Sequence, residues 1–439
     1  MTFDPSLTLD PYQVEGAHFL AGRRRAILAD GMGLGKTPQA IRASDLAGAH
    51  SVLVLCPAIG RAMWEREFRR WGRLPRAVEI YSYTKYARDK ALRKATEARA
   101  KAGLIDTLIL DEAHYLKTRD SDRTKAIYGR LVDGGLAAAM PHVWLLSGTI
   151  VPNHALELWT HMHALWPNLI AFNPTRPMKF DEFAVRYCRM KPNTVGFSVM
   201  ENKKETIGEL REALRRVALR RTFIPDLPPL LGPFDHVVEA ETVSADLKML
   251  EQDIDPDARA LIVEMAEAGI SISDTVPIAT LRRITGIAKA HTVAQLVAEE
   301  LRAGEYDKII LFAYHSDVLA ILAERLFDHG VVIIDGKTSE KKRLEAERRF
   351  QQDMNVRVML GQIIAASTTI TLHAAAEVGL VEMSWSPHDN AQAIKRAHRY
   401  GQKKTVRARA FTLAGSIDED VGRVLARKTR MTLEILGEQ

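Results

Sequence analysis

Several short segments of the sequence carry residue types suited to binding and cleaving a phosphoanhydride. Residues Ala29–Thr37 read Ala-Asp-Gly-Met-Gly-Leu-Gly-Lys-Thr and lie between a strand pattern and a helical pattern. Glycines in such a turn let backbone N–H groups surround phosphate oxygens, and the following helix adds the positive end of its dipole. Gly33 and Gly35 would form this loop, Lys36 would reach the β- and γ-phosphates, and the Thr37 hydroxyl would hold Mg²⁺. The segment therefore predicts a nucleotide phosphate loop.

One position departs from the usual form of this loop. The pattern has a glycine five residues before Gly35, and here this position is Asp30. The alternative interpretation is a glycine-rich strand-to-helix turn with an incidental lysine. The flanking strand and helix patterns favour the phosphate loop.

A second segment supplies two adjacent acids. Residues Leu108–His114 read Leu-Ile-Leu-Asp-Glu-Ala-His, so Asp111 and Glu112 end a buried strand. An acid in this place can hold a metal through its waters, and its neighbour can polarise the attacking water. We therefore assign Asp111 to Mg²⁺ and Glu112 to the role of general base. The alternative is a strand-end acidic pair that only caps the next helix, and the phosphate loop makes it the less favoured one.

These loops need strands to position them. Apolar runs alternate with helical patterns in two stretches of the chain, and this alternation predicts parallel strands joined by crossover helices. The strand patterns cover residues 25–29, 51–55, 107–110, 143–146, 308–312, 331–335, 356–360 and 379–383. The alternation pauses between about Asn168 and Glu300, which reads mostly helical around a proline-rich piece. We therefore expect an α/β protein with two units and a helical insertion between them.

The expected boundaries follow from this pattern. Residues 1–225 would form lobe 1, with a helical protrusion near 154–222. Residues 226–303 would form a linker and the helical protrusion of lobe 2. Residues 304–439 would complete lobe 2 and end in a long helix, before which Ser416 and Glu419 offer a capping box.

Composition narrows the class of protein. The 439 residues suffice for two or three domains, and the excess of 61 Lys and Arg over 55 Asp and Glu permits an anionic partner. Only two cysteines are present, which excludes a disulfide framework or a cysteine-based zinc site and favours a reducing, intracellular setting. No apolar run approaches the ~20 residues of a membrane span, and the first residues show no secretory signal pattern. We expect no membrane partner.

The order of the segments resembles the helicase-like ATPases of superfamily two, and among them the Swi/Snf-type double-stranded DNA translocases, in which Asp30 is normal at the loop start. Leu9–Gly16 looks like the opening motif of that branch, and Gln392–Gln402 looks like its last motif. Leu219–Arg221 lies where the family keeps an equivalent segment. Thr285–Lys289 is most similar to the fork-remodelling, strand-annealing subgroup. The resemblance implies two RecA-like lobes, with ATP and Mg²⁺ as cofactors.

The resemblance also implies roles for individual residues. Gln13 would read the adenine edge, and Gln392 would add to the nucleotide site. Three residues would couple the γ-phosphate to lobe movement: His114, Ser147 and Thr149. Arg396 and Arg399 would act as arginine fingers that the second lobe delivers, so that hydrolysis depends on conformation.

Duplex DNA would bind along a seam made by both lobes, without sequence preference. The resemblance implies five contact residues: Arg61, His315, Thr338, Ser367 and Thr368. Residues 367–369 read Ser-Thr-Thr where relatives usually carry glycines, and the positive-φ geometry that glycine allows becomes costly there. The arginines that follow Arg61 along its helix could instead be solvated surface charge.

The leading hypothesis is an ATP-dependent translocase on double-stranded DNA that remodels protein–DNA complexes or DNA forks. A strand-separating or RNA-directed helicase is the second hypothesis, and a nucleotide-gated DNA clamp without turnover is the third. No segment resembles a histone reader, so a nucleosome partner is not expected, whereas a recruiting protein is compatible with a bare motor. The expected location is the cytoplasm of a bacterium or viral host cell, or the nucleus in a eukaryote.

Overall fold

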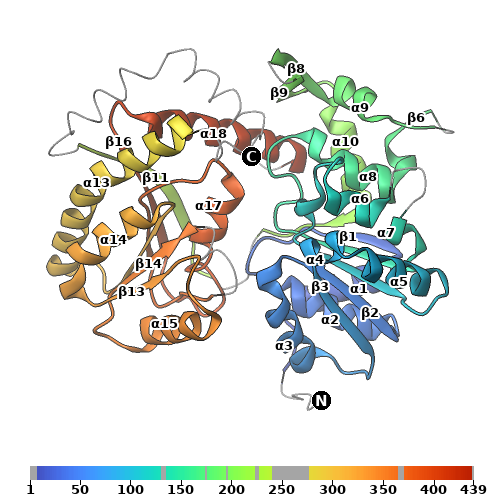
Figure 1. Ribbon diagram of the computed structural model, residues 1–439, viewed down its shortest axis with the longest axis horizontal. Helices are drawn as coiled ribbons and strands as arrows, with labels where there is room; N and C mark the ends of the chain where they lie inside the picture. The colour runs from blue at the N-terminus through green and yellow to red at the C-terminus, as the bar shows by residue number, and fades with distance from the viewer. Residues whose placement is uncertain are drawn as a thin grey trace. The chain divides into compact units, whose positions relative to one another are not determined.

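A computed structural model of the chain shows two units, each built on its own parallel sheet (Figure 1). The structure describes residues 7–129, 135–173, 176–193, 196–222, 227–239, 276–363 and 370–437. Unit 1 comprises Met1–Met190, Glu201–Phe223 and Met431–Gln439, and unit 2 comprises Lys191–Met200 and Ile224–Arg430. We call them lobe 1 and lobe 2. The predicted α/β class with two parallel-sheet lobes is confirmed.

Within the described ranges, the main sheet of lobe 1 has six strands in the order β10-β1-β5-β4-β2-β3, all parallel. Their bounds are Ala218–Leu219 for β10, Arg25–Leu28 for β1, His142–Leu146 for β5, Thr107–Asp111 for β4, Ser51–Cys56 for β2 and Ala77–Ser82 for β3. Central strands of a parallel sheet are buried on both faces, so they read as continuous apolar runs. This explains why the sequence identified β1, β2, β4 and β5.

The helices of lobe 1 pack against this sheet and against one another. Leu20 of α1 (Pro11–Ala21), Ile41 of α2 (Lys36–Leu46) and Trp64 of α3 (Arg61–Trp71) join one apolar cluster with residues of β1, β2 and β5. The next helices pack against one another in the same lobe: α4 (Tyr83–Arg88), α5 (Lys90–Lys101), α6 (Asp122–Tyr128) and α7 (Gly135–Ala139).

The predicted protrusion near 154–222 contains helices and two short hairpins. The helical parts are η3 (Ala155–Leu158), α8 (Trp159–Leu165), η4 (Pro167–Ile170), α9 (Phe180–Tyr187) and α10 (Ile207–Val217). The hairpin strands are β6 (Ala171–Asn173), β7 (Arg176–Pro177), β8 (Cys188–Asn193) and β9 (Gly196–Asn202). Asn202 donates a 2.8 Å hydrogen bond to the Met431 carbonyl, which ties the end of the chain to lobe 1.

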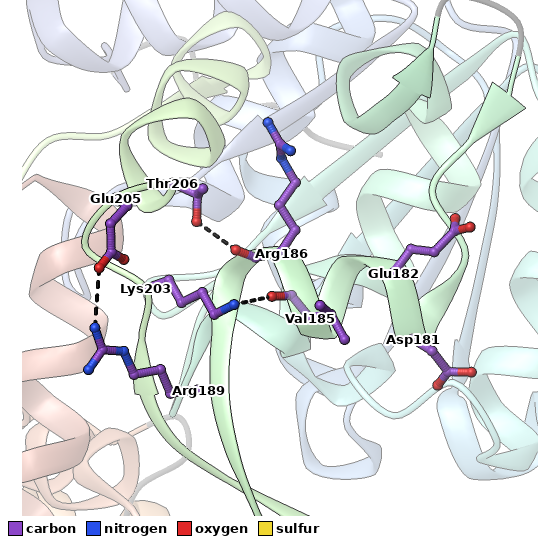
Figure 2. Close-up of a pocket in the computed structure, with 8 residues that line it drawn as sticks. All are labelled: Asp181, Glu182, Val185, Arg186, Arg189, Lys203, Glu205 and Thr206. Carbon is purple, nitrogen blue, oxygen red and sulfur yellow. Dashed lines mark hydrogen bonds and ion pairs between the residues drawn. The ribbon is translucent and has the colours of Figure 1, made fainter.

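A surface pocket lies on this protrusion (Figure 2), and none of the predicted nucleotide residues lines it. Its lining residues are Asp181, Glu182, Val185, Arg186, Arg189, Lys203, Glu205 and Thr206. Internal contacts occupy most of the charges: Arg189 pairs with Glu205 at 3.2 Å, and the Lys203 ammonium donates to the Val185 carbonyl at 2.6 Å. The pocket therefore offers little free charge to a ligand.

Lobe 2 has six parallel strands among its described residues, in the order β11-β16-β15-β12-β14-β13. Their bounds are Leu230–Val238 for β11, Val406–Leu413 for β16, Glu377–Leu380 for β15, Ile309–Ala313 for β12, Val358–Gln362 for β14 and Val331–Ile334 for β13. Residues of α13 (Val276–Ala303) and α14 (Ser316–Arg325) share an apolar cluster with the sheet. Residues of α15 (Glu340–Gln352) and α17 (Pro387–Ile394) share another. The short η5 (Phe327–His329) follows α14, and α18 (Ile417–Leu436) ends the chain.

Three expectations differ from the structure. The supposed linker at 226–303 contains β11, which pairs along its length with β16, so this segment is part of the sheet of lobe 2. Residues 431–439 group with lobe 1 and not with lobe 2. Before α18, the Glu419 carboxylate accepts from the Gly415 N–H at 2.8 Å, while the Ser416 hydroxyl accepts from Asp418 at 3.2 Å. This is a variant of the predicted capping box, shifted by one residue.

Among the helices that the structure describes, none is long and apolar enough to cross a membrane.

We expect lobe 1 to lose stability in mild acid because of one buried histidine. Burial lowers the pKa of His161 to about 3, and its Nδ1 lies 2.9 Å from the Tyr128 hydroxyl. The unfolded chain takes up this proton near pH 6.5, so the stability present above pH 6.5 is lost as the pH falls toward 3. Linkage gives a loss of about 2 kcal/mol between pH 8 and pH 5.

Urea unfolding at pH 8 and pH 5 measures this effect. In His161→Asn, an amide replaces the imidazole, and the pH slope should flatten although the variant is less stable at pH 8. The control His18→Asn changes an exposed histidine of α1 and should keep the wild-type slope. Equal slopes in all three proteins would contradict the prediction.

Candidate functional site

Three predicted segments meet at one edge of the sheet of lobe 1. Strands β1, β5 and β4 are neighbours and run parallel, so their carboxyl ends lie together. The phosphate loop follows β1, Ser147 follows β5, and Asp111 ends β4. Ligands of open parallel sheets bind at this edge, beyond the carboxyl ends of the strands. The strand order therefore gathers residues that lie more than 100 positions apart in the sequence.

The phosphate loop closes onto the amino end of α2. Gly35 has φ of 70°, and a side chain there would begin 2.4 Å from the Gln13 amide nitrogen, so glycine is required on two counts. The Lys36 ammonium donates to the carbonyls of Asp30 at 2.9 Å and Gly31 at 3.2 Å. Burial lowers the pKa of Lys36, while the charges of Glu112, Asp30 and Asp111 oppose this shift. Because burial disfavours the charged ammonium, a polyanion that binds beside it would stabilise this charge strongly.

Asp30, the departure from the usual loop, is fully buried and paired. Its carboxylate lies 2.6 Å from the Arg221 guanidinium and accepts a 3.1 Å hydrogen bond from the Gln39 amide. The aspartate therefore has a structural partner in the segment Leu219–Arg221, which the sequence singled out without a role.

Two aromatic residues hold Asp111 at the end of β4. The Trp64 indole N–H donates to one carboxylate oxygen at 2.7 Å, and the Tyr83 hydroxyl donates to the Asp111 carbonyl at 2.7 Å. Burial and the neighbouring Glu112 charge raise the pKa of Asp111 to about 6, against the lowering effects of Trp64 and Lys36. A divalent cation would reverse this shift, because it favours the ionised carboxylate.

Glu112 has a strained backbone. Its φ of 49° is the only positive value found for a non-glycine residue in the described part of the chain. Such strain costs about 1–3 kcal/mol and is common at functional sites. The left-handed turn ends β4 and starts the short η2 (Ala113–Leu116).

His114 lies between the acidic pair and the loop after β5. The His114 Nδ1 lies 3.3 Å from a Glu112 carboxylate oxygen and 3.1 Å from the Ser147 hydroxyl. The Ser147 hydroxyl also accepts from the Thr149 N–H at 3.2 Å. The structure thus joins Glu112 to all three residues to which the resemblance assigned coupling, although it does not test that role.

Residues 149–153, in the loop that follows Ser147, are anchored by a buried acid. The Glu157 carboxylate accepts from the Asn153 backbone at 2.8 Å and pairs with Lys117 at 2.7 Å. Burial opposes ionisation here, yet Lys117 and the hydrogen bonds together lower the pKa of Glu157 to about 2. The loop after β5 is therefore fixed in place.

Gln13 lies beside the phosphate loop. Its amide nitrogen donates to the Leu34 carbonyl at 3.2 Å, and its oxygen accepts from the Asp10 N–H at 3.1 Å in a capping box of α1. The position fits a nucleotide site, and the role in reading adenine stays a prediction.

The residues present fit a Mg²⁺ ion. Thr37 is the second residue of α2 and offers a hydroxyl oxygen, and Asp111 offers a carboxylate beside two further acidic charges. Magnesium prefers oxygen ligands and few protein groups, with water and phosphate oxygens completing its shell. Thr37 and Asp111 would hold the ion, which would neutralise charge on the phosphates when bound.

The arginine-bearing segment of lobe 2 is shaped by Gln402. This side chain is 6% exposed, and its amide nitrogen donates to the carbonyls of His373, Ala375 and Ala397 at 2.8–3.2 Å. Its oxygen accepts two backbone N–H groups. Arg396, Arg399 and Gln392 are partly buried at this segment and at the end of α17. The glutamine of the last motif therefore builds the turn that carries the arginines.

Two predicted DNA contacts of lobe 2 lie on loops that are joined to one another. The His315 Nδ1 lies 2.6 Å from the buried Glu382 carboxylate, and the Thr338 hydroxyl donates to Asp335 at 2.6 Å. Gln362 connects these loops, because it accepts from Gly336 and donates to the Tyr314 carbonyl, both at 2.9 Å. Ser367 and Thr368 lie outside the described residues. In lobe 1, Arg61 is exposed at the start of α3 and lies 4.0 Å from Glu65.

Three residues of the motif Thr285–Lys289 are buried in lobe 2: Thr285, Gly286 and Lys289. The Lys289 ammonium pairs with Asp418 at 2.5 Å and donates to the Phe411 carbonyl at 2.8 Å. Gly286 faces the carboxylate that holds His315, since a side chain there would begin 2.7 Å from a Glu382 oxygen and 2.8 Å from Val318. The motif thus supports the loop after β12.

We expect Gly286→Ala to destabilise lobe 2, although alanine normally favours a helix over glycine by about 1 kcal/mol. The added methyl group would displace Glu382 or Val318, and overpacking of a core typically costs about 1–3 kcal/mol. Urea unfolding measures the change. The control Gly422→Ala lies in α18, where the added carbon would have no atom within 4 Å apart from the nearby backbone of its own helix, and it should be neutral or stabilising. A stabilised Gly286→Ala protein would show that the crowding is relieved without cost.

Sequence reasoning missed the residues that hold the site residues in place. Trp64 is completely buried, and its hydrogen bond to Asp111 was not foreseen. The side chains of Tyr83, Gln39 and Glu382 were not considered. Each acts across 9 to 67 positions of sequence, so no local spacing could reveal it. The segment containing Arg221 was noticed only through the resemblance.

Comparisons with known proteins agree with this geometry. Residues 12–102 and 76–226 match the SNF2-related domain, and residues 288–401 match the helicase conserved C-terminal domain. A SWI/SNF-related matrix-associated actin-dependent regulator of chromatin subfamily A-like protein 1 homolog from Caenorhabditis elegans is 29% identical over 99% of this chain and 62% of its own length. The DNA annealing helicase and endonuclease ZRANB3 of Homo sapiens is 27% identical over 96% of this chain and 40% of its own length.

Among solved structures, the Sulfolobus solfataricus SWI2/SNF2 ATPase core in complex with dsDNA covers 99% of this chain and 94% of that chain, with 21% identity and a TM-score of 0.43. The chain spans less than two thirds of the length of the curated relatives named above. With an SNF2-related domain followed by a helicase C-terminal domain, the chain belongs to the SWI/SNF-related family of helicase-like proteins.

Proposed function

We propose that this protein is a DNA-dependent ATPase that translocates on double-stranded DNA and thereby remodels protein–DNA complexes or DNA forks. One observation carries the proposal: the phosphate loop, the acidic pair and the Ser147 loop gather at the carboxyl edge of three adjacent parallel strands. Membership of the SWI/SNF-related family supports duplex DNA as the substrate, since relatives bear the names of a chromatin regulator and a DNA annealing helicase.

Each residue of the site has a separate role toward one ATP molecule. Lys36 and the loop N–H groups would bind the phosphates, while Thr37 and Asp111 would hold Mg²⁺, which would offset charge on the phosphates. Glu112 accepts a proton from the attacking water, and Arg396 and Arg399 of lobe 2 stabilise charge on the transferred phosphoryl group. Because these arginines belong to the other lobe, hydrolysis would require lobe closure. Alternation between closed and open lobes would then move Arg61 and the loops of His315 and Thr338 along the DNA backbone.

Phosphate release by the purified protein, measured with and without duplex DNA, tests the proposal. We expect strong stimulation by duplex DNA of any sequence, weakened by salt, and no activity in Lys36→Ala. Faster unwinding of forked DNA or RNA than translocation on duplex would favour a strand-separating helicase. ATP-dependent retention on DNA with little phosphate release would favour a clamp. Hydrolysis that ignores DNA would contradict the proposal.

A further inference from the structure

Arg221 joins three separate segments of lobe 1. Its guanidinium lies 2.6 Å and 2.9 Å from the two carboxylate oxygens of Asp30, at the start of the phosphate loop. It donates to the side-chain oxygen of Gln39 in α2 at 2.9 Å, and to the backbone carbonyl of Tyr12 in α1. It also lies 3.3 Å from the Glu15 carboxylate of α1. One side chain therefore connects the loop with the two helices that flank it.

The pair between Arg221 and Asp30 is shielded from water. Asp30 is fully buried, and the Arg221 side chain is 17% exposed. Four N–H groups donate to the carboxylate: the backbone N, Nε and Nη2 of Arg221 and the amide of Gln39, at 2.6–3.1 Å. An acid with this many donors is held in one place, and removal of the arginine would leave it buried without its charge partner.

Backbone pairing adds to this connection. The Ala29 N–H donates to the Leu219 carbonyl and the Gly31 N–H donates to the Arg221 carbonyl, both at 2.7 Å. The pairing of β10 with β1 thus continues into the first residues of the phosphate loop. The loop start is fixed by both the main chain and the side chain of Arg221.

The network reaches the residues that would touch the nucleotide. Gln39 donates to the Leu34 carbonyl at 3.0 Å, and Gln13 donates to the same carbonyl at 3.2 Å. Leu34 and Gly35 immediately precede Lys36. A shift of α1 relative to α2 would therefore move Gln13 with respect to Lys36.

We propose that Arg221 is a positioning residue that sets the register between α1 and the phosphate loop, so that base contacts from α1 and phosphate contacts from Lys36 fall on the same ATP. This inference rests on the proposed function of the site. Because Arg221 acts through other residues, its loss should change nucleotide affinity and base selection more than the chemical step.

Arg221→Met and Arg221→Lys in the full chain test this. Direct titration with fluorescent analogues of ATP and GTP, without DNA, reports affinity, and duplex-stimulated turnover reports KM and kcat. For Arg221→Met we expect ATP affinity and KM to worsen on the order of tenfold or more, the preference for ATP over GTP to shrink, and kcat to stay within about threefold. Arg221→Lys keeps the charge without the planar fork and should lie between.

Arg76→Met is the matched control, because it removes another buried arginine of lobe 1, one that pairs with Asp45. It should lower the unfolding midpoint without changing base preference. If Arg221→Met behaves like this control, or if Arg221→Lys equals the wild type in affinity and base preference, the proposal is wrong. A wild-type protein that binds ATP but ignores duplex DNA would contradict the proposed function and leave this test intact.

Discussion

Glu112→Gln should reduce duplex-stimulated ATP hydrolysis by about 10²–10⁴-fold while ATP still binds. Glutamine has nearly the same shape as glutamate and can keep the contact with His114, but it cannot accept the proton of the attacking water. The substitution also removes the neighbouring charge that raises the pKa of Asp111. Asp111 should then be more fully ionised, so Mg²⁺-dependent ATP binding should be preserved or become tighter.

Single-turnover phosphate release and equilibrium ATP binding separate these two effects. Glu79→Gln serves as the control, since it alters a carboxylate on the edge strand β3 that pairs with Arg99. Its turnover should equal that of the wild type. A Glu112→Gln protein that keeps more than about a tenth of the rate would mean that another group accepts the proton. Loss of ATP binding would mean that Glu112 acts on the ground state instead.

The sequence predicted most of the strands that are buried on both faces. The strand patterns at 51–55 and 143–146, for example, correspond closely to β2 and β5. Two edge strands were missed: β3 is only partly buried over its first three residues, and β11 is exposed along most of its length. A strand of this kind lacks the continuous apolar run, because only one face or neither is covered. The edge strand β13 was found, because its four residues are all apolar. The proline-rich start of β11 made it look like a linker.

The residues of the site also fall into two groups: those that the sequence predicted and those that it did not. The residues that touch nucleotide in the proposed function form local motifs, because a phosphate loop needs its glycines, lysine and threonine in one turn. The residues that hold them, such as Trp64 for Asp111 and Glu382 for His315, come from other strands and helices. Such pairs arise from the strand order, which a single sequence does not contain. Asp30 shows what a single sequence cannot predict. Its place in the loop could be read from the sequence, but its partner Arg221 lies 191 residues away.

The motif Thr285–Lys289 gives a second case of this kind. The sequence connected it to a subgroup of relatives, and the structure supplies a packing reason for its glycine and its lysine. Neither residue lies at the sheet edge with the nucleotide motifs. Their contacts with Glu382 and Asp418 instead stabilise the loop of His315 and the start of α18.

Arg399→Ala should lower the duplex-stimulated ATPase rate by about 10³-fold or more and leave ATP binding to lobe 1 unchanged. An arginine finger contributes about 10³–10⁵ to phosphoryl transfer, because its guanidinium offsets charge that develops only in the transition state. Gln402 fixes the turn that presents this arginine, and its backbone N–H donates to the Arg399 carbonyl at 2.9 Å. The backbone that carries Arg399 is thus held by a buried side chain.

Two further variants decide whether the arginine acts as a finger or only as a positive charge. Arg399→Lys keeps the charge but not the forked donors, so it should recover little of the lost rate. Lys403→Ala removes an exposed charge from the same turn, four residues along, and should leave the rate unchanged. If Lys403→Ala and Arg399→Ala reduce the rate equally, the segment attracts DNA electrostatically, and salt should then reproduce the defect in the wild type. If only Arg399→Ala loses ATPase activity, and this variant still stays on DNA when ATP is bound, then Arg399 is needed for hydrolysis and not for DNA binding. Its loss would turn a translocase into a nucleotide-gated clamp.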